Sequence, residues 1–150
     1  MIVDSFRFSH SISVRWSEVD AQGVVFNPHY LTFADIAVTE YYRAIGMPYP
    51  TAFDVDVADL YARKTQIEYH ASARFDDVLD LYVRVSRLGR SSFDFCIEVL
   101  RDKESIATIE MTYVHANLEK QKSVPLADKF RDACITFENV APKQEYTFDV

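Results

Sequence analysis

The sequence contains one segment in which apolar residues have helical spacing, and its other patterned segments alternate apolar and polar residues. This combination limits the possible folds more than any other feature of the sequence. Within residues 28–45 the apolar side chains recur every three or four positions, at Tyr30, Phe33, Ala34, Ala37, Tyr41 and Ile45. This spacing indicates a long helix with one apolar face. Asn27 and Pro28 are typical of a helix start, because Asn can cap free backbone N–H groups and Pro suits the first helical position. Gly46 and Pro48 end the helix.

Five other segments alternate apolar and polar residues, which is the pattern of half-buried strands. They cover residues 6–16, 65–71, 79–85, 93–99 and 106–118. Short loops join the last four, so neighbouring strands are expected to run antiparallel. A final short helix is expected to begin near Pro125 and to bury Leu126, Phe130 and Cys134. The order of elements predicts an α+β fold, with one long helix on one face of an antiparallel five-stranded sheet.

Chain length and charge narrow the class of protein. A chain of 150 residues fits a single domain, expected to span residues 1–150. No apolar run approaches the roughly 20 residues that cross a bilayer. The first 15 residues lack the apolar core of a signal peptide, so a cytoplasmic protein is expected. The net charge of −7 opposes binding to a phosphate backbone, so no nucleic-acid partner is expected.

Cysteine and histidine residues show no spacing typical of a metal site, so no metal is expected. Cys96 lies in a strand pattern and Cys134 in a helical one, and both are expected to be free thiols in the core. His10, His70 and His115 lie on strand patterns. Core or surface placement is therefore expected for all three.

The predicted sheet is wider than one helix can cover. Part of its surface, or one of its edges, should therefore pair with a second copy of the chain. A homo-oligomer is expected on this ground.

A stretch of eleven residues resembles the signature D-x-x-G-[VI]-V-[FWY]-x-x-x-Y of the 4-hydroxybenzoyl-CoA thioesterase family. It reads Asp20-Ala21-Gln22-Gly23-Val24-Val25-Phe26-Asn27-Pro28-His29-Tyr30. Similar enzymes include the short acyl-CoA thioesterases associated with the bacterial Tol-Pal system. Residues 73–79 look like the family's turn into its third strand, and residues 90–93 look like its next strand entry. Together the match covers about residues 6–118.

The resemblance implies the hotdog fold, in which an antiparallel sheet wraps one long helix. It also implies a homodimer or homotetramer with active sites between two subunits. Fold alone does not establish an activity, because one fold hosts several chemistries. The residues of the site must carry the functional prediction.

A thioester hydrolase needs a carboxylate or water aimed at the carbonyl carbon, and positive charge aimed at the developing oxyanion. Asp20 precedes the helix, and Gly23 allows the loop between them to turn tightly. The resemblance implies that the backbone N–H of Asn27 polarises the thioester carbonyl. It also implies that Asp20 attacks the carbon or activates water, and these two roles stay open. The alternative is that Asp20 merely caps a turn or the helix.

Three residues at the start of the helix are candidate substrate-binding groups. His29 is either a second polar group near the thioester or an exposed residue of the first turn, and the family often has Asn at this position. Tyr30 and Phe33 are expected in the core, although in a hotdog dimer the same helix face can line the acyl pocket.

Coenzyme A carries phosphates, so an acidic protein needs a local basic site to bind it. Arg87 and Arg90, together with Ser91 and Ser92, are the candidates, and the resemblance implies that this region contacts the nucleotide end of CoA. The match is partial, because two positions that are basic in the family hold Gly89 and Ser91 here. The alternative is that both arginines are solvated turn residues.

The sequence therefore predicts an acyl-CoA thioester hydrolase that needs no cofactor, since coenzyme A is part of the substrate. One alternative is a thioesterase that acts on an acyl-carrier protein. Another is a non-catalytic acyl-CoA-binding protein, although such a protein has no use for a carboxylate beside the thioester. A hotdog hydratase or dehydratase is not favoured, because the Asp and His pair that it needs is absent from the sequence.

Overall fold

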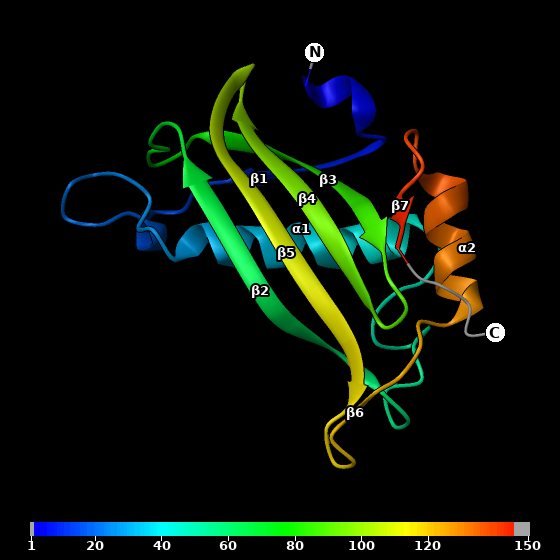
Figure 1. The fold of residues 1–150 in the computed structure, drawn as a ribbon. Helices are drawn as coiled ribbons and strands as arrows, with labels where there is room; N and C mark the ends of the chain where they lie inside the picture. Colours follow the sequence, from blue (N-terminus) through cyan, green and yellow to red (C-terminus); the bar gives the residue numbers. More distant parts are fainter. Residues whose placement is uncertain (1, 146–150) are drawn as a thin grey trace.

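The structure, a computed structural model, describes residues 2–145 and consists of a curled sheet that faces two helices (Figure 1). In chain order the elements are η1 (Ile2–Ser5), β1 (Phe8–Ser13), η2 (Trp16–Glu18), α1 (His29–Ala44), β2 (Asp59–Tyr69), β3 (Val78–Leu88), β4 (Ser92–Arg101), β5 (Glu104–Asn117), β6 (Lys122–Ser123), α2 (Asp128–Phe137) and β7 (Lys143–Gln144). The five long strands lie in the order β1-β3-β4-β5-β2, and every neighbouring pair is antiparallel. This arrangement confirms the predicted α+β hotdog fold.

Two short strands extend the sheet beyond the five that were predicted. β6 pairs antiparallel with β5, and β7 pairs parallel with β3. Each is two residues long. A pattern of alternating residues cannot reveal a strand of that length, because a period of two needs several repeats to be visible.

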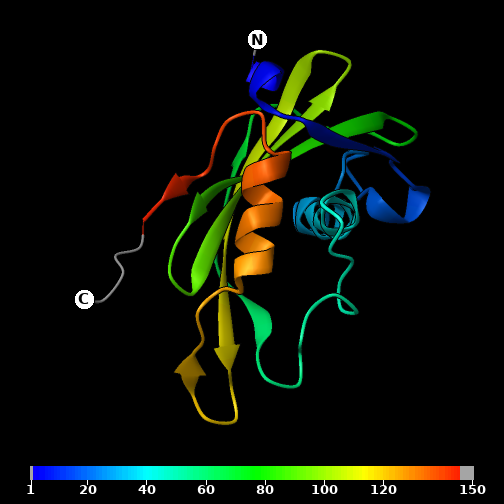
Figure 2. The same ribbon diagram turned by 90° about the vertical axis from the view of Figure 1, so that its right-hand side faces the viewer.

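Helix α1 lies in the curve of the sheet, where Figure 2 shows it end-on. Its observed bounds differ by one residue at each end from the predicted range of 28–45. The buried stripe consists of Tyr30, Phe33, Ala34, Ala37, Val38, Tyr41 and Tyr42. No side-chain hydrogen bond caps the start of the helix, so the cap predicted from Asn27 is not formed. The backbone bonds of the first turn are local: the N–H of His29 donates to the carbonyl of Phe26, and the N–H of Leu31 donates to that of Pro28.

Helix α2 covers the inner face of the sheet beyond the C-terminal end of α1 (Figure 2). The ring centroid of Phe130 lies 4.8 Å from that of Phe93 on β4 and 5.8 Å from that of Phe53. Leu126, Phe130 and Cys134 are all buried, as predicted. Neither α1 nor α2, nor any other helix within residues 2–145, is long and apolar enough to cross a membrane.

The first strand is shorter than the sequence predicts. β1 ends at Ser13, and Trp16, which was expected on its apolar face, is 73% exposed and lies edge-on to Phe75 with ring centroids 5.3 Å apart. The chain leaves the sheet after Val14, whose N–H donates to the carbonyl of Asp77 at 2.8 Å. The 3₁₀ turn of η2 then begins at Trp16, and this turn breaks the alternation that the pattern suggested.

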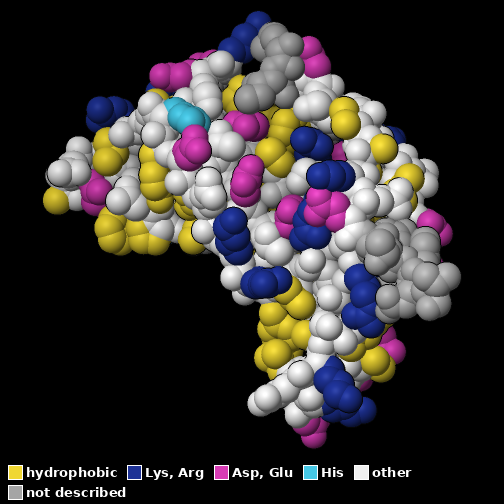
Figure 3. Space-filling view, viewed as in Figure 1, with side chains coloured by type: hydrophobic (Ala, Val, Ile, Leu, Met, Phe, Trp, Pro, Cys, Tyr) yellow, Lys and Arg dark blue, Asp and Glu magenta, His cyan; other side chains and the backbone are white. Residues whose placement is uncertain are grey.

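The two surfaces of the sheet differ in character. The inner face consists of buried apolar side chains such as Val83, Phe95 and Ile109. The outer face carries basic side chains intermixed with acidic ones, as Figure 3 shows. Strand register places Lys64, Arg84, Arg87, Asp94, Glu98 and Glu110 on that outer face. At the edge of the sheet, most residues of β2 are exposed, and within the described chain β2 pairs with β5 alone among the long strands. One long edge of the sheet is therefore uncovered.

Candidate active site

Asp20 lies at the tip of a tight hairpin formed by residues 18–26. The N–H of Asp20 donates to the carbonyl of Val24 at 2.9 Å, and the N–H of Gly23 donates to the carbonyl of Asp20 at 2.9 Å. These bonds define a three-residue loop of the kind that places a left-handed residue at its end. Gly23 is that residue, with φ +79°. A Cβ added to Gly23 would meet no atom within 4 Å, so its backbone conformation, and not lack of space, calls for glycine.

The carboxylate of Asp20 is oriented by the hairpin itself. Its Oδ1 accepts the N–H of Gln22 at 2.8 Å, a local bond typical of an aspartate that begins a turn. The turn-capping role is therefore present in the structure. Within residues 2–145, Oδ2 has no hydrogen-bond partner, and the residue is half-buried. One oxygen thus holds the side chain in place while the other remains available to water or to a substrate.

The backbone around Asn27 leaves one hydrogen-bond donor free. The N–H of Phe26 donates to the carbonyl of Glu18, and the N–H of His29 donates to the carbonyl of Phe26, both at 2.9 Å. No acceptor in the described part of the chain takes the N–H of Asn27. This donor lies at the start of α1, where the helix dipole is positive. Asp20 is two residues from Glu18, or about 7 Å of extended chain, and Glu18 is bonded to Phe26, the residue before Asn27.

An ion pair between the exposed Arg15 and the buried Glu18 supports the base of the hairpin. The carboxylate of Glu18 accepts the backbone N–H of Arg15 at 2.7 Å and the guanidinium of Arg15 at 3.0 Å, and Glu18 is only 3% exposed. Burial raises the pKa of this carboxyl, but the hydrogen bonds and charge of Arg15 together outweigh burial and lower it. Glu18 is therefore held ionised. The sequence pattern does not reveal this role, because the usual signal of a capped turn has Ser, Thr, Asp or Asn three residues before the Glu, and this chain has Arg15 there.

The three candidate residues on the first turns of α1 have different surroundings. His29 is half-buried, and its ring lies edge-on to Phe26 with centroids 6.0 Å apart. Tyr30 and Phe33 are 2% and 0% exposed, and the hydroxyl of Tyr30 accepts the N–H of Ala73 at 3.2 Å. Both are thus core residues of the single chain, as expected. Their contact with an acyl group stays a prediction.

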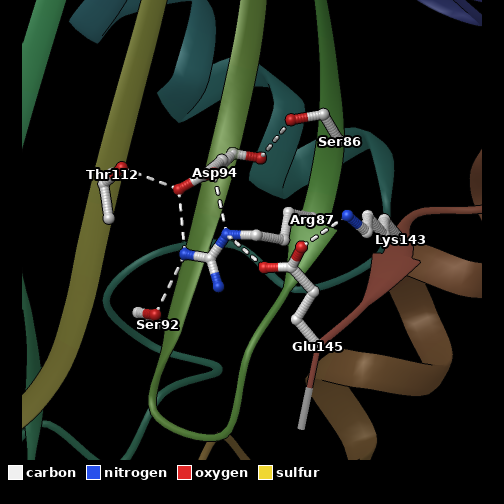
Figure 4. Close-up of polar contacts among 7 residues, drawn as sticks. All are labelled: Ser86, Arg87, Ser92, Asp94, Thr112, Lys143 and Glu145. Atoms are coloured by element: carbon white, nitrogen blue, oxygen red, sulfur yellow. Dashed lines mark hydrogen bonds and ion pairs between the residues drawn. The ribbon is translucent and has the colours of Figure 1, made fainter.

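Arg87 is held by carboxylates on the outer face of the sheet (Figure 4). Its Nε donates to Oδ2 of Asp94 at 2.7 Å, and its Nη2 donates to Oδ1 of Asp94 and to Oγ of Ser92, both at 3.0 Å. Glu145 lies 3.9 Å from Nε. The hydrogen bonds to Asp94 raise the pKa of the guanidinium. Arg87 therefore links β3 to β4, and its charge is largely neutralised within the protein.

Arg90 lies in the turn between β3 and β4 and is exposed. The N–H of Gly89 donates to the carbonyl of Ser92 at 2.7 Å and closes the turn. Arg131 of α2, which is 7% exposed, donates to the carbonyls of Gly89 and Arg90 at 2.7 Å each. Ser91, the residue after Arg90, is half-buried. The turn is thus rigidly attached to α2, and Arg90 presents its side chain to solvent, where an anionic ligand could reach it.

The two sets of candidate residues lie at opposite ends of the sheet. β3 begins beside the Asp20 hairpin and ends at the turn that carries Arg90, as can be followed in Figure 1. Its 11 residues separate these ends by about 33 Å at ~3.3 Å per residue. Asp20, Gly23, Asn27 and His29 therefore belong to one short segment at the start of β3, and Arg87, Arg90, Ser91 and Ser92 lie at the other end of this strand.

Two cavities lie along the flank of α1 that faces β2. One, of about 210 Å³, is lined by Asp35, Val38, Tyr42, Tyr49, Leu60 and Tyr113 among others. The second, of about 200 Å³, lies past the end of α1, and its lining includes Met47, Phe53, Leu60, His115, Leu126 and Phe130. Leu60 borders both. Both cavities therefore adjoin the uncovered edge of the sheet.

Both cysteines are free thiols, and neither is placed for catalysis. Burial raises the pKa of the Cys134 thiol to about 12, and burial also raises that of Cys96. A thiol with a raised pKa is a poor nucleophile near neutral pH. Residues 2–145 contain no group of three or more His, Cys, Asp and Glu side chains that could hold a metal ion.

Comparisons with known proteins find thioesterases among the relatives of this chain. "Acyl-CoA thioesterase YbgC" of Haemophilus influenzae is 25% identical over 126 residues, which cover 84% of this chain and 93% of that protein. "Acyl-CoA thioester hydrolase YbgC" of Escherichia coli O157:H7 is 27% identical over 99 residues, which cover 66% of this chain and 73% of that protein.

Solved structures share the fold at lower identity. A 1,4-dihydroxy-2-naphthoyl-CoA thioesterase from Synechocystis superposes with a TM-score of 0.79 at 19% identity, over 85% of this chain and 94% of that one. A thioesterase from Thermus thermophilus, complexed with coenzyme A and Zn, superposes with a TM-score of 0.78 at 22% identity. The superposition covers 91% of this chain and 98% of that one. The sequence profile of the thioesterase-like superfamily matches residues 14–134, which include the Asp20 hairpin, α1 and the Arg90 turn. The chain therefore belongs to the thioesterase-like superfamily.

Proposed function

We propose that this protein is an acyl-CoA thioester hydrolase that releases a carboxylic acid and coenzyme A. The observation that carries the proposal is that two groups of one short segment have no partner in the described chain: one carboxylate oxygen of Asp20, at the tip of the hairpin, and the backbone N–H of Asn27, directly after the hairpin. Membership of the thioesterase-like superfamily supports it. So do the relatives named as acyl-CoA thioesterases.

In the first of two possible routes, Asp20 acts as a general base. Its free oxygen accepts a proton from a water molecule, whose oxygen attacks the carbonyl carbon of the thioester. The carbonyl oxygen becomes negative and accepts a hydrogen bond from the N–H of Asn27; one such donor is typically worth about 10²–10³ in rate. The C–S bond then breaks, its electron pair leaves on the sulfur of CoA, and the thiolate takes up the proton.

In the second route, Asp20 acts as the nucleophile. Its oxygen attacks the carbonyl carbon, CoA leaves as the thiolate, and a mixed anhydride between Asp20 and the acyl group forms. Water then hydrolyses the anhydride. Both routes use the same Asn27 donor. Rapid quenching followed by mass spectrometry distinguishes them, because acylated Asp20 accumulates only on the second route.

A second copy of the chain completes the site in this proposal. β2 has a long free edge of unpaired backbone groups, which is a natural pairing surface. If two β2 strands pair antiparallel, the end of the partner sheet that carries the Arg90 turn lies beside the Tyr69 end of the first chain. Arg90 of the second copy would then lie about 15 Å to the side of the first chain's β2, three strand spacings of ~4.8 Å each. A homodimer, or a homotetramer built from such dimers, is therefore proposed.

This arrangement assigns a place to each part of the substrate. The thioester lies between Asp20 and Asn27, and the phosphates of CoA are received by Arg90 with Ser91 of the second copy. The acyl group extends from Asn27 along α1 towards the cavity beside Asp35 and Val38. Coenzyme A arrives with the substrate, so the proposed reaction uses no resident cofactor.

A thiol-release assay over a panel of acyl-CoA esters tests the proposal. The same acyl groups should be presented on an acyl-carrier protein and on pantetheine, which lacks the nucleotide. Turnover of CoA esters that Asp20→Asn abolishes is the expected result. Turnover of carrier-protein esters alone would favour the alternative substrate. Saturable binding of acyl-CoA without release of thiol would identify a binding protein and reject the hydrolase.

A further inference from the structure

Tyr69, the last residue of β2, connects the edge of the sheet to the start of α1. Its hydroxyl donates to the backbone carbonyl of Asn27 at 3.3 Å. Its ring lies 5.6 Å from that of Tyr30, at an interplanar angle of 69°. Tyr30 is itself anchored, because its hydroxyl accepts the N–H of Ala73. The aromatic pair therefore holds the Tyr69 hydroxyl at a defined position beside Asn27.

The carbonyl of Asn27 has no partner from the helix that follows it. In a regular helix start, the N–H of Leu31 could reach this oxygen, but it donates to the carbonyl of Pro28 at 3.1 Å instead. Pro28 itself has no N–H. The Tyr69 hydroxyl is therefore the donor that restrains the carbonyl of Asn27 in the described chain.

The peptide units on both sides of Asn27 are thus fixed. The preceding carbonyl, that of Phe26, accepts the N–H of His29 at 2.9 Å, which orients the peptide that carries the Asn27 N–H. The following carbonyl accepts Tyr69. These two planes meet at the Cα of Asn27. The bond to His29 holds the plane that contains the Asn27 N–H, and the bond to Tyr69 holds the following plane. Loss of the Tyr69 bond therefore removes one of the two restraints on the position of Asn27.

We infer that Tyr69 is a positioning residue for thioester hydrolysis: its hydroxyl fixes the Asn27 backbone so that the Asn27 N–H points at the substrate carbonyl oxygen. The inference rests on the proposed function, because it concerns the same carbonyl. An oxyanion donor acts only within a narrow range of distance, about 2.7–3.1 Å, so a small rotation is costly to the rate. Tyr69 is 51% exposed, and water can replace its hydroxyl at little cost in stability. Its loss should therefore lower kcat and leave the fold intact.

Tyr69→Phe tests the inference, because it removes the hydroxyl and keeps the ring that packs on Tyr30. We expect kcat to fall about tenfold with KM within about twofold of wild type, the pattern of an interaction that matters in the transition state. The melting temperature should be unchanged. Tyr61→Phe is the matched control, since Tyr61 is an exposed tyrosine on the same strand, and it should leave kcat unchanged.

A second measurement reads the polarisation of the carbonyl without turnover. Isotope-edited infrared spectra should be recorded of an acyl-CoA bound to Asp20→Asn and to the double variants that add Tyr69→Phe or Tyr61→Phe. In Asp20→Asn and in the variant that adds Tyr61→Phe, the carbonyl band of the bound ester should lie at lower wavenumber than the band of the free ester. In the variant that adds Tyr69→Phe, the band should lie closer to that of the free ester.

The outcomes separate this inference from the proposed function. A wild-type protein that hydrolyses thioesters, with a Tyr69→Phe variant of equal kcat, would overturn the role of Tyr69 alone. A carbonyl band that is identical with and without the Tyr69 hydroxyl would overturn it as well. A wild type that releases no thiol would reject the hydrolase, while the infrared comparison would still decide whether Tyr69 orients Asn27.

Discussion

The carbonyl oxygen of Glu18 accepts the backbone N–H of Phe26 at 2.9 Å, and this bond closes the hairpin that carries Asp20 back onto the start of α1. Asp20 is two residues from one partner of the bond, and Asn27 directly follows the other. The spacing between the carboxylate and the N–H is therefore controlled by local chain geometry. Changes within the hairpin should alter catalysis more than they alter stability.

Asp20→Asn should lower kcat by about 10² or more, as expected for the loss of a positioned acid–base or nucleophilic group. The variant should fold normally, because the Asn side-chain oxygen can still accept the N–H of Gln22. Steady-state thiol release and circular dichroism check both parts. Asp76→Asn is the control, since Asp76 is an exposed turn residue with positive φ that Asn tolerates. Near-normal turnover of Asp20→Asn would remove Asp20 from the mechanism.

Gly23→Ala should reduce both stability and kcat. Gly23 has φ +79°, and an L residue in this region costs about 1–2 kcal/mol. The hairpin relieves this strain by shifting, which moves Asp20 relative to Asn27. Thermal unfolding and thiol release on the same sample measure the two effects.

Gly46→Ala offers a matched comparison for Gly23→Ala. Gly46 follows α1, has φ +81°, and also has open space around an added Cβ. We expect a similar loss of stability with unchanged kcat. If both variants lose kcat equally, the loss in Gly23→Ala follows from lower stability of the whole protein and not from a shift of the hairpin.

Arg90→Ala should raise KM for CoA esters by about tenfold, the size of one lost ionic contact to a phosphate. KM for pantetheine esters should not change, because they lack the nucleotide. Arg87→Ala is the contrasting variant: it loses its bonds to Asp94, at a cost of about 1 kcal/mol or less for a partly exposed pair, and KM should stay constant. Equal KM effects of Arg90→Ala on both kinds of ester would reject the phosphate contact.

Mixing two inactive or impaired variants tests the shared site. An oligomer that combines an Asp20→Asn chain with an Arg90→Ala chain contains one site with the native Asp20 of one chain and the native Arg90 of the other. We therefore expect subunit exchange to restore activity with the wild-type KM. If Asp20 and Arg90 act within one chain, mixing restores no wild-type site, and activity keeps the high KM of Arg90→Ala. Light scattering after size exclusion checks that oligomers are present.

Glu138 should make stability fall as pH rises. Its carboxylate is 8% exposed and accepts the hydroxyl of Tyr41 and, at 2.8 Å, the N–H of Val85, so it joins α1 to β3. Burial raises the pKa of Glu138 above its ordinary value near 4.5. Between the ordinary and the raised pKa the folded state binds more protons than the unfolded state. The free energy of unfolding therefore declines with increasing pH by up to about 1.4 kcal/mol per unit.

Urea unfolding of wild type and Glu138→Gln at a series of pH values from about 4.5 upwards measures this contribution. The free energy of unfolding of wild type should decline relative to that of Glu138→Gln as pH rises, because Gln does not titrate. Glu119→Gln, at an exposed turn position, should run parallel to wild type. A difference that stays constant with pH would show that Glu138 titrates normally in the folded protein.

Helix α1 and the five long strands could be predicted from sequence because their periodicities extend over many residues. The end of β1 could not, since Trp16 continues the alternation although the chain has already left the sheet to form η2. The turn begins where Arg15 and Glu18 pair, and a charge pair three residues apart leaves the apolar pattern unbroken. Local hydrogen bonding overrode periodicity at that point.

The candidate site was predictable to the extent that its parts are neighbours in the chain. Asp20, Gly23 and Asn27 fall within eight residues, and their signature stays recognisable. Tyr69 escaped notice because it lies 42 residues from Asn27. Its hydroxyl meets the start of α1 only when the last strand residue of β2 and the helix are packed on the same sheet.

By itself, the sequence predicted helix α1 and the central part of each long strand, and it pointed to the proposed catalytic pair, because periodicity and turn formation depend on residues close together in the chain. Tertiary structure alone decided which arginine is available to a ligand. Arg87 and Arg90 look equivalent in the sequence, but the register of β3 and β4 places Asp94 against Arg87 and leaves Arg90 in the turn. Strand register is a long-range property, since it follows from how whole side-chain faces pack, and a charge is neutralised or free according to that register.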